Sequence, residues 1–150
     1  MGRKDMDSVP GKIVFKCSVT SADSSSLRER WQVLLGVVGD LSVEVCGRTL
    51  YREVEFPLVE LAVDLSKWLQ KVEKTNESFV FASMESEEPG LVWLRCEDER
   101  WRVGSVHQEY EEKRTFSLCE VASAARAYID RLTDTLLQIH GIDIRDLLTR

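Results

Sequence analysis

The sequence predicts a single α+β domain, with a mainly antiparallel sheet of about five to six strands and two principal helices packed on one face. Short stretches that alternate between apolar and polar residues come in two groups, as strands joined by turns do. Each group is followed by a longer stretch in which apolar residues recur every three or four positions, as in an amphipathic helix. Because the strands are grouped and do not alternate with helices, an antiparallel sheet is favoured.

The first group of strands precedes Pro57. Residues 12–19 alternate between apolar and polar side chains, which predicts a half-buried strand. Residues 41–45 and 50–56 alternate in the same way on either side of a turn at 46–48. These two stretches therefore predict a hairpin.

The second group of strands lies in the middle of the chain. Residues 79–84, 91–96 and 101–107 are apolar stretches of strand length. A charged turn at 85–90 and an acidic turn at 97–99 separate them. Turns of this kind between apolar stretches predict a three-stranded meander.

The two helices are predicted from their periodicity and their ends. The first begins after Pro57, a residue that suits the first helical turn, and ends near Lys74. The second begins at residues 117–120, Ser-Leu-Cys-Glu, a capping box in which serine and glutamate satisfy each other's free backbone amides. Gly141 is the expected C-cap. Residues 27–38 fit either a short helix or the start of a strand.

A chain of 150 residues suits one domain, 1–150, with enough length for a core without disulfides. Residues 1–11 are polar and are expected to form a flexible N-terminal segment, and they lack the apolar stretch of a signal peptide. Residues 142–150 form a short C-terminal tail, which could dock as a last turn. No apolar stretch approaches the roughly 20 residues of a membrane-spanning helix, so a cytoplasmic location without membrane contact is expected.

Excess negative charge is confined to one part of the chain. The net charge is −6, which disfavours direct binding to nucleic acid, because such binding neutralises phosphates. Nine acidic and three basic residues lie between Glu85 and Glu112, and this difference equals the net charge of the whole chain.

The predicted meander gathers most of these acids at one end. The turn at 85–88 and the segment at 109–112 both lie at the end opposite the turn at 97–99. Solubility and edge protection would explain such an acidic rim, and so would a docking face for a basic partner. The rim is predicted to contain Glu85, Glu87, Glu88, Glu109, Glu111 and Glu112. Trp93 lies near these acids in sequence and is expected either to pack in the core or to anchor a partner.

The four cysteines contain no CxxC pair and are expected to be free, mostly buried thiols. The two histidines, His107 and His140, have no spacing that suggests a metal site. No phosphate-binding loop or nucleophile signature is present. These observations predict neither a cofactor nor catalysis. A small enzyme that uses a cleft near His107, together with Cys96 or a carboxylate, is an alternative.

Three segments carry a family resemblance: residues 81–94, residues 101–110, and the helix that opens at Pro57. Together they resemble small bacterial proteins that look like immunity proteins of polymorphic toxin or contact-dependent growth inhibition systems. The resemblance covers most of the chain, from the first strand to the last helix. It is a pattern of segments and not a catalytic signature, so it carries no contact residues over.

The resemblance implies a cytoplasmic domain that binds the C-terminal domain of its cognate toxin and blocks it. Many such toxins are basic nucleases, which suits occlusion of the toxin's active site by an acidic surface. The acidic rim and its nearby tryptophan, and not the resemblance, indicate the partner-binding residues expected: Glu85, Glu87, Glu88, Trp93, Glu109 and Glu111. A monomer is expected. A homodimeric assembly subunit is a further alternative.

Overall fold

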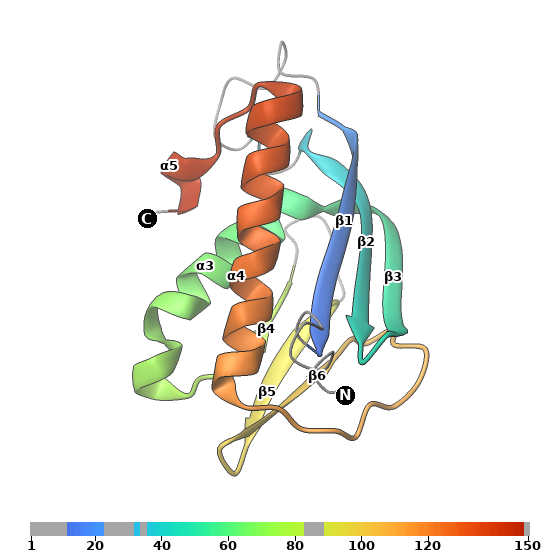
Figure 1. Ribbon diagram of the computed structural model, residues 1–150, viewed down its shortest axis with the longest axis vertical. Coiled ribbons are helices and arrows are strands. Elements are labelled where there is room, and N and C mark those ends of the chain that lie inside the picture. The colour runs from blue at the N-terminus through green and yellow to red at the C-terminus, as the bar shows by residue number, and fades with distance from the viewer. Residues whose placement is uncertain (1–11, 23–31, 34–35, 83–88, 149–150) are drawn as a thin grey trace, which may run out of the picture.

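The computed structural model describes residues 12–22, 32–33, 36–82 and 89–148. Its α+β fold is the one predicted, with antiparallel strands and two long helices (Figure 1). The six strands are divided between two sheets of three strands. The first sheet contains, in spatial order, β1 (Ile13–Ser21), β2 (Val38–Val45) and β3 (Arg48–Pro57). The predicted first strand and hairpin are thus confirmed.

The second sheet is the predicted meander, with a shorter first strand. It contains β4 (Phe79–Val80), β5 (Trp93–Glu97) and β6 (Arg100–Gly104). The turn between β5 and β6 is confirmed, since Glu97 pairs with Arg100 across it. Residues 83–88, which include the predicted turn between the first two strands, lie outside the described residues.

The two long helices begin where their sequences predict. α3 (Leu58–Thr75) follows Pro57, and α4 (Leu118–Thr135) follows Ser117. The capping box is confirmed: the Glu120 N–H donates to Ser117 Oγ at 3.1 Å, and the Ser117 N–H donates to Glu120 Oε1 at 2.9 Å. This second bond is the main reason why the pKa of Glu120 is lowered.

The C-terminal part of the chain docks against α3. α4 continues into a π-helical turn, η1 (Leu136–His140), which ends at Gly141 with φ 69°. A short helix, α5 (Arg145–Leu148), follows. Ser66 of α3 donates from Oγ to the carbonyl oxygen of Leu148 at 2.8 Å, and Leu147 is buried. Of the short tail predicted over residues 142–150, the described part, 142–148, is therefore packed on the domain.

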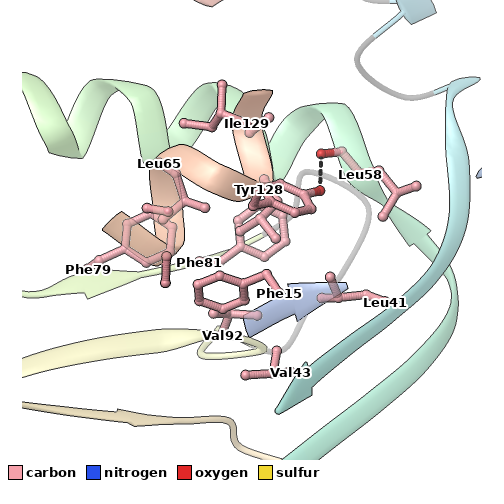
Figure 2. Packing of buried hydrophobic residues seen from close by; sticks show 14 of the residues in the cluster. Phe15, Leu41, Val43, Leu58, Leu65, Phe79, Phe81, Val92, Tyr128 and Ile129 are labelled. Atoms are coloured by element: carbon pink, nitrogen blue, oxygen red, sulfur yellow. Dashed lines mark hydrogen bonds between the residues drawn. The ribbon is translucent and has the colours of Figure 1, made fainter. Parts of the chain in front are cut away.

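One core joins the helices to both sheets. Tyr128 of α4 is buried and donates from its hydroxyl to the carbonyl oxygen of Leu58 at 2.7 Å (Figure 2). Its ring lies 6.1 Å from that of Phe15 on β1. In the second sheet, Trp101 packs edge-on against Trp68 of α3 with ring centroids 5.5 Å apart. Because burial favours the neutral phenol, the pKa of Tyr128 is raised well above its ordinary value.

The four cysteines are free, as predicted, but they are less buried than expected. Cys46 and Cys119 are exposed, while Cys17 and Cys96 are half-buried. The prediction of mostly buried thiols fails because Cys46 lies in the β2–β3 turn with φ 51° and Cys119 lies on the outer side of the first turn of α4. None of the helices in the described part of the chain is long and apolar enough to cross a membrane.

Candidate functional site

An irregularity in the pairing of β2 with β3 exposes a short segment of β3. Asp40 on β2 faces two residues of β3, Val54 and Glu55, where regular pairing would give one. Such a β-bulge bends the strand and redirects its side chains. Glu55 has φ 54°, which is uncommon for a residue other than glycine. The side chain of Val54 is 65% exposed, so the bulge presents an apolar side chain next to carboxylates.

A shallow depression of about 500 Å³ lies beside the bulge. The three strands of the first sheet form most of its lining, and one residue comes from the segment that follows β6. We define the β3-bulge surface as the charged side chains of this depression together with its exposed valine. These residues are Lys16, Asp40, Arg52, Glu53, Val54 and Glu109.

Glu109 reaches this surface because its segment is fastened to the first sheet. Its N–H donates to the carbonyl oxygen of Leu50 on β3 at 2.7 Å. The ring of the next residue, Tyr110, lies under the guanidinium of Arg48, with 3.7 Å between the guanidinium carbon and the ring centroid. A residue far along the chain is thereby held beside β3.

A buried carboxylate fixes the same segment from the other side. Glu112 is only 3% exposed and accepts hydrogen bonds from Arg114 Nε at 2.8 Å and from the Tyr110 hydroxyl at 3.1 Å. Its backbone carbonyl accepts from Arg102 Nη2 of β6 at 2.9 Å. The prediction that Glu112 belongs to an exposed rim is therefore wrong. Its charge is satisfied within the fold and cannot serve a partner.

Acid should weaken this arrangement. The hydrogen bonds from Arg114 lower the pKa of Glu112 below its ordinary 4.5, although burial acts in the opposite direction. A carboxyl whose pKa is lower in the folded state than in the unfolded state stabilises the fold at pH values above its unfolded-state pKa. This stabilisation is lost as the pH falls through the folded-state pKa. We expect Glu112→Gln to lower the free energy of unfolding by about 2 kcal/mol at pH 7 and by clearly less at pH 3.

Urea denaturation at the two pH values would measure this difference. Glu97→Gln is a suitable control, because Glu97 is exposed at the end of β5. It should change stability by less than about 0.5 kcal/mol at either pH. An equal loss for Glu112→Gln at pH 3 and pH 7 would contradict the assigned role of its charge.

The carboxylates of the β3-bulge surface are largely available to a partner. In the described part of the chain, the side chains of Asp40, Arg52 and Glu109 form no hydrogen bond or ion pair. Lys16 lies 3.1 Å from Glu44, which offsets its charge. Because three carboxylates face two bases and one base is already paired, the surface favours a positively charged ligand group.

Comparison with known proteins places this domain in a family. A family model described as a domain of unknown function, DUF7878, matches residues 13–138. The chain belongs to this family. The match runs from the first residue of β1 into η1, so the DUF7878 region contains both sheets and both long helices. No curated protein and no solved structure matches the chain significantly.

The predicted partner-binding residues that the structure describes lie at different places in this DUF7878 domain. Glu109 lies in the β3-bulge surface. Glu111 is exposed but lies outside it, with its carboxylate 3.8 Å from Arg102 Nη2. Trp93 is only 8% exposed, because its ring packs on Gly104 and lies 4.2 Å from the Arg95 guanidinium. Trp93 is therefore too buried to serve as an exposed anchor for a partner. Glu85, Glu87 and Glu88 lie outside the described residues.

The pair suggested for a small enzyme is not assembled. Cys96 pairs with Trp101 near the β5–β6 turn, whereas His107 follows the far end of β6. The two side chains are thus at opposite ends of the hairpin. His107 is exposed, and its backbone N–H donates to Ser105 Oγ at 3.0 Å. In the part of the chain that the structure describes, no group of three or more histidine, cysteine or carboxylate side chains could hold a metal ion.

Of the six residues of this surface, the sequence predicted only Glu109. It missed the other five: Lys16, Asp40, Arg52, Glu53 and Val54. Regular alternation would have paired β3 with β2 without interruption, and the sequence offers no glycine in β3 to mark a bulge. The one available signal was Gly39 beside Asp40, because a glycine inside a strand often marks a bulge or a close backbone approach.

Proposed function

We propose that this chain is an immunity protein that binds a cognate toxin domain and neutralises it through the β3-bulge surface. The observation that carries the proposal is the exposed Val54 beside the carboxylates of Asp40, Glu53 and Glu109. An apolar contact surrounded by charge is a common arrangement in specific protein interfaces. The class of partner, a toxin domain, comes from the resemblance of the sequence to immunity proteins.

The mechanism is occlusion. A nuclease binds nucleic acid through lysine and arginine side chains that neutralise phosphates. The carboxylates of the β3-bulge surface would pair with such side chains and occupy the place of the phosphates. Opposite charges speed the encounter, and burial of Val54 slows dissociation. No reaction is required of the immunity protein, which acts in the cytoplasm as a monomer and binds neither nucleic acid nor membrane.

Growth protection tests this proposal. The cognate toxin domain of the proposal is expressed in a sensitive bacterium, with and without the chain. We expect the chain to restore growth and to co-purify with the toxin domain in a 1:1 complex. A catalytically inactive toxin serves as the control for expression burden. Unchanged toxicity, with both proteins present at comparable levels and no complex, would refute the immunity role.

A further inference from the structure

The connection from β6 to α4 contains no helix and no strand, although all of its residues are described. Its two ends are anchored. The Val106 N–H donates to the carbonyl oxygen of Gly90 at 2.8 Å, and Phe116 and Trp101 exchange two backbone hydrogen bonds of 2.8 Å. We call the part between these anchors, residues 107–115, the strap. Figure 1 shows the chain swinging out past the end of β3 before it returns to α4.

The strap docks on the domain almost without apolar contacts. Its only buried residue is Glu112, a carboxylate. Tyr110 is half-buried, and the remaining strap residues are polar or charged. Segments that bury little apolar surface are the ones that open locally while the rest of a domain stays folded.

Three arginine side chains of neighbouring strands fasten the strap. The guanidinium carbon of Arg48 on β3 lies 3.7 Å from the ring centroid of Tyr110. From β6, Arg100 and Arg102 donate from Nη2 to carbonyl oxygens of the strap at 3.0 and 2.9 Å. Arg48 and Arg100 are exposed, and polar contacts at an exposed surface are individually weak. Releasing the strap therefore costs far less than unfolding the core.

Glu112 gives the strap its shape. Its carboxylate accepts hydrogen bonds from Arg114 Nε and Nη2 at 2.8 and 3.1 Å and from the Tyr110 hydroxyl at 3.1 Å. Since all three residues belong to the strap, the carboxylate orders the strap internally and holds the Tyr110 ring where Arg48 covers it. A segment that is already ordered loses less conformational entropy when it docks.

We propose that the strap opens as one unit while the rest of the domain stays folded, and that Glu112 keeps it closed and thereby positions Glu109 on the β3-bulge surface. In the closed strap, the Glu109 N–H donates to the carbonyl oxygen of Leu50 at 2.7 Å. Within the described part of the chain, this is the only backbone–backbone hydrogen bond between the strap and β3. Opening breaks this bond and withdraws the Glu109 carboxylate from the surface. Glu112 is therefore a positioning residue that touches no partner itself.

Closure of the strap and partner binding are then linked. Only the closed strap completes the β3-bulge surface, so a ligand of this surface favours closure to the same degree as closure favours the ligand. Asp40 and Val54 stay in place when the strap opens, because both belong to the first sheet. This consequence for binding rests on the proposed toxin-binding role, whereas the opening of the strap does not.

Native-state hydrogen exchange, followed by NMR on the full chain, tests the opening. The Glu109 N–H reports on the strap, and the N–H of Tyr128, a buried residue in the middle of α4, reports on the core. We expect the Glu109 N–H to be at least tenfold less protected than the Tyr128 N–H. Its exchange should also depend less than one-third as steeply on urea concentration, because opening the strap exposes little surface. Equal protection and equal urea dependence at both positions would overturn the inference.

Substitutions at two adjacent carboxylates test the role of Glu112. Glu112→Gln should speed exchange of the Glu109 N–H about 30-fold. Glu111→Gln, which alters the exposed carboxylate beside it, should change this rate less than threefold. Val72→Ala, at a buried position of α3, should speed exchange at Tyr128 about tenfold and leave Glu109 within threefold. Equal effects of the Glu111 and Glu112 substitutions, or equal responses of Glu109 and Tyr128 to Val72→Ala, would overturn the inference.

Addition of the toxin domain tests the link between the strap and binding. A saturating concentration of the toxin domain should slow exchange of the Glu109 N–H in the wild type at least tenfold. A toxin domain that binds without slowing this exchange would overturn the positioning role of Glu112. A toxin domain that does not bind would refute the proposed function, and the exchange rates of the free chain would still decide whether the strap opens.

Discussion

Gly39→Ala should be among the most damaging single substitutions in this domain, with a loss of about 3 kcal/mol in the free energy of unfolding. An added Cβ would overlap the carbonyl oxygen of Ser18 on β1 and lie 2.9 Å from Leu58 Cδ1 of α3. The backbone of Ser18 is held in the sheet and cannot yield as a flexible side chain could. Pairing shifts between Val19 and Ser21 and at Asp40 place the two strands this close.

Thermal unfolding would measure the loss as a fall in Tm of roughly 6 to 12 °C. Gly47→Ala is the matched control: its added Cβ meets nothing within 4 Å, but its φ of 84° carries conformational strain. The control should cost about 1 to 2 kcal/mol. If the two variants lose equal stability, the close approach of Ser18 does not explain the glycine at residue 39.

The elements of this fold follow from sequence signals that act over short distances. The period-two pattern of β1 and the apolar spacing of α3 depend on neighbouring residues alone, and both predictions agree with the structure. The capping box is equally local, because its two residues, Ser117 and Glu120, lie three positions apart in the sequence. The division of six strands between two sheets depends on contacts between distant segments, such as the 5.4 Å approach of the Phe56 and Phe81 rings.

The candidate site was only partly predictable for the same reason. The acidity of the segment that contains Glu109 is visible in the sequence, but its attachment to β3 depends on Leu50, which lies 59 residues earlier. The burial of Glu112 could not be predicted from the sequence. A high density of acidic residues along the chain does not show whether a given carboxylate is hydrogen-bonded inside the fold or exposed to solvent. Trp93 shows the same limit, since its exposure depends on space left by Gly104 on the neighbouring strand.

Charge reversal of the β3-bulge surface should cause the largest loss of function. We expect Asp40→Lys combined with Glu109→Lys to raise Kd for the toxin domain at least 100-fold, or about 2.7 kcal/mol. Both side chains are exposed, and neither forms an ion pair with a described residue, so the fold should be retained. Reversal replaces attraction with repulsion at the place where basic side chains would dock.

Isothermal titration of the toxin domain with three proteins is the most direct test of the toxin-binding surface. These are the wild type, the Asp40→Lys/Glu109→Lys variant, and a control carrying Glu73→Lys with Glu97→Lys. The control changes net charge by the same amount at exposed positions on α3 and β5, outside the β3-bulge surface. We predict a 100-fold loss for the surface variant and less than threefold for the control. Equal affinities for all three proteins, or equal losses in both variants, would contradict the assignment of this surface.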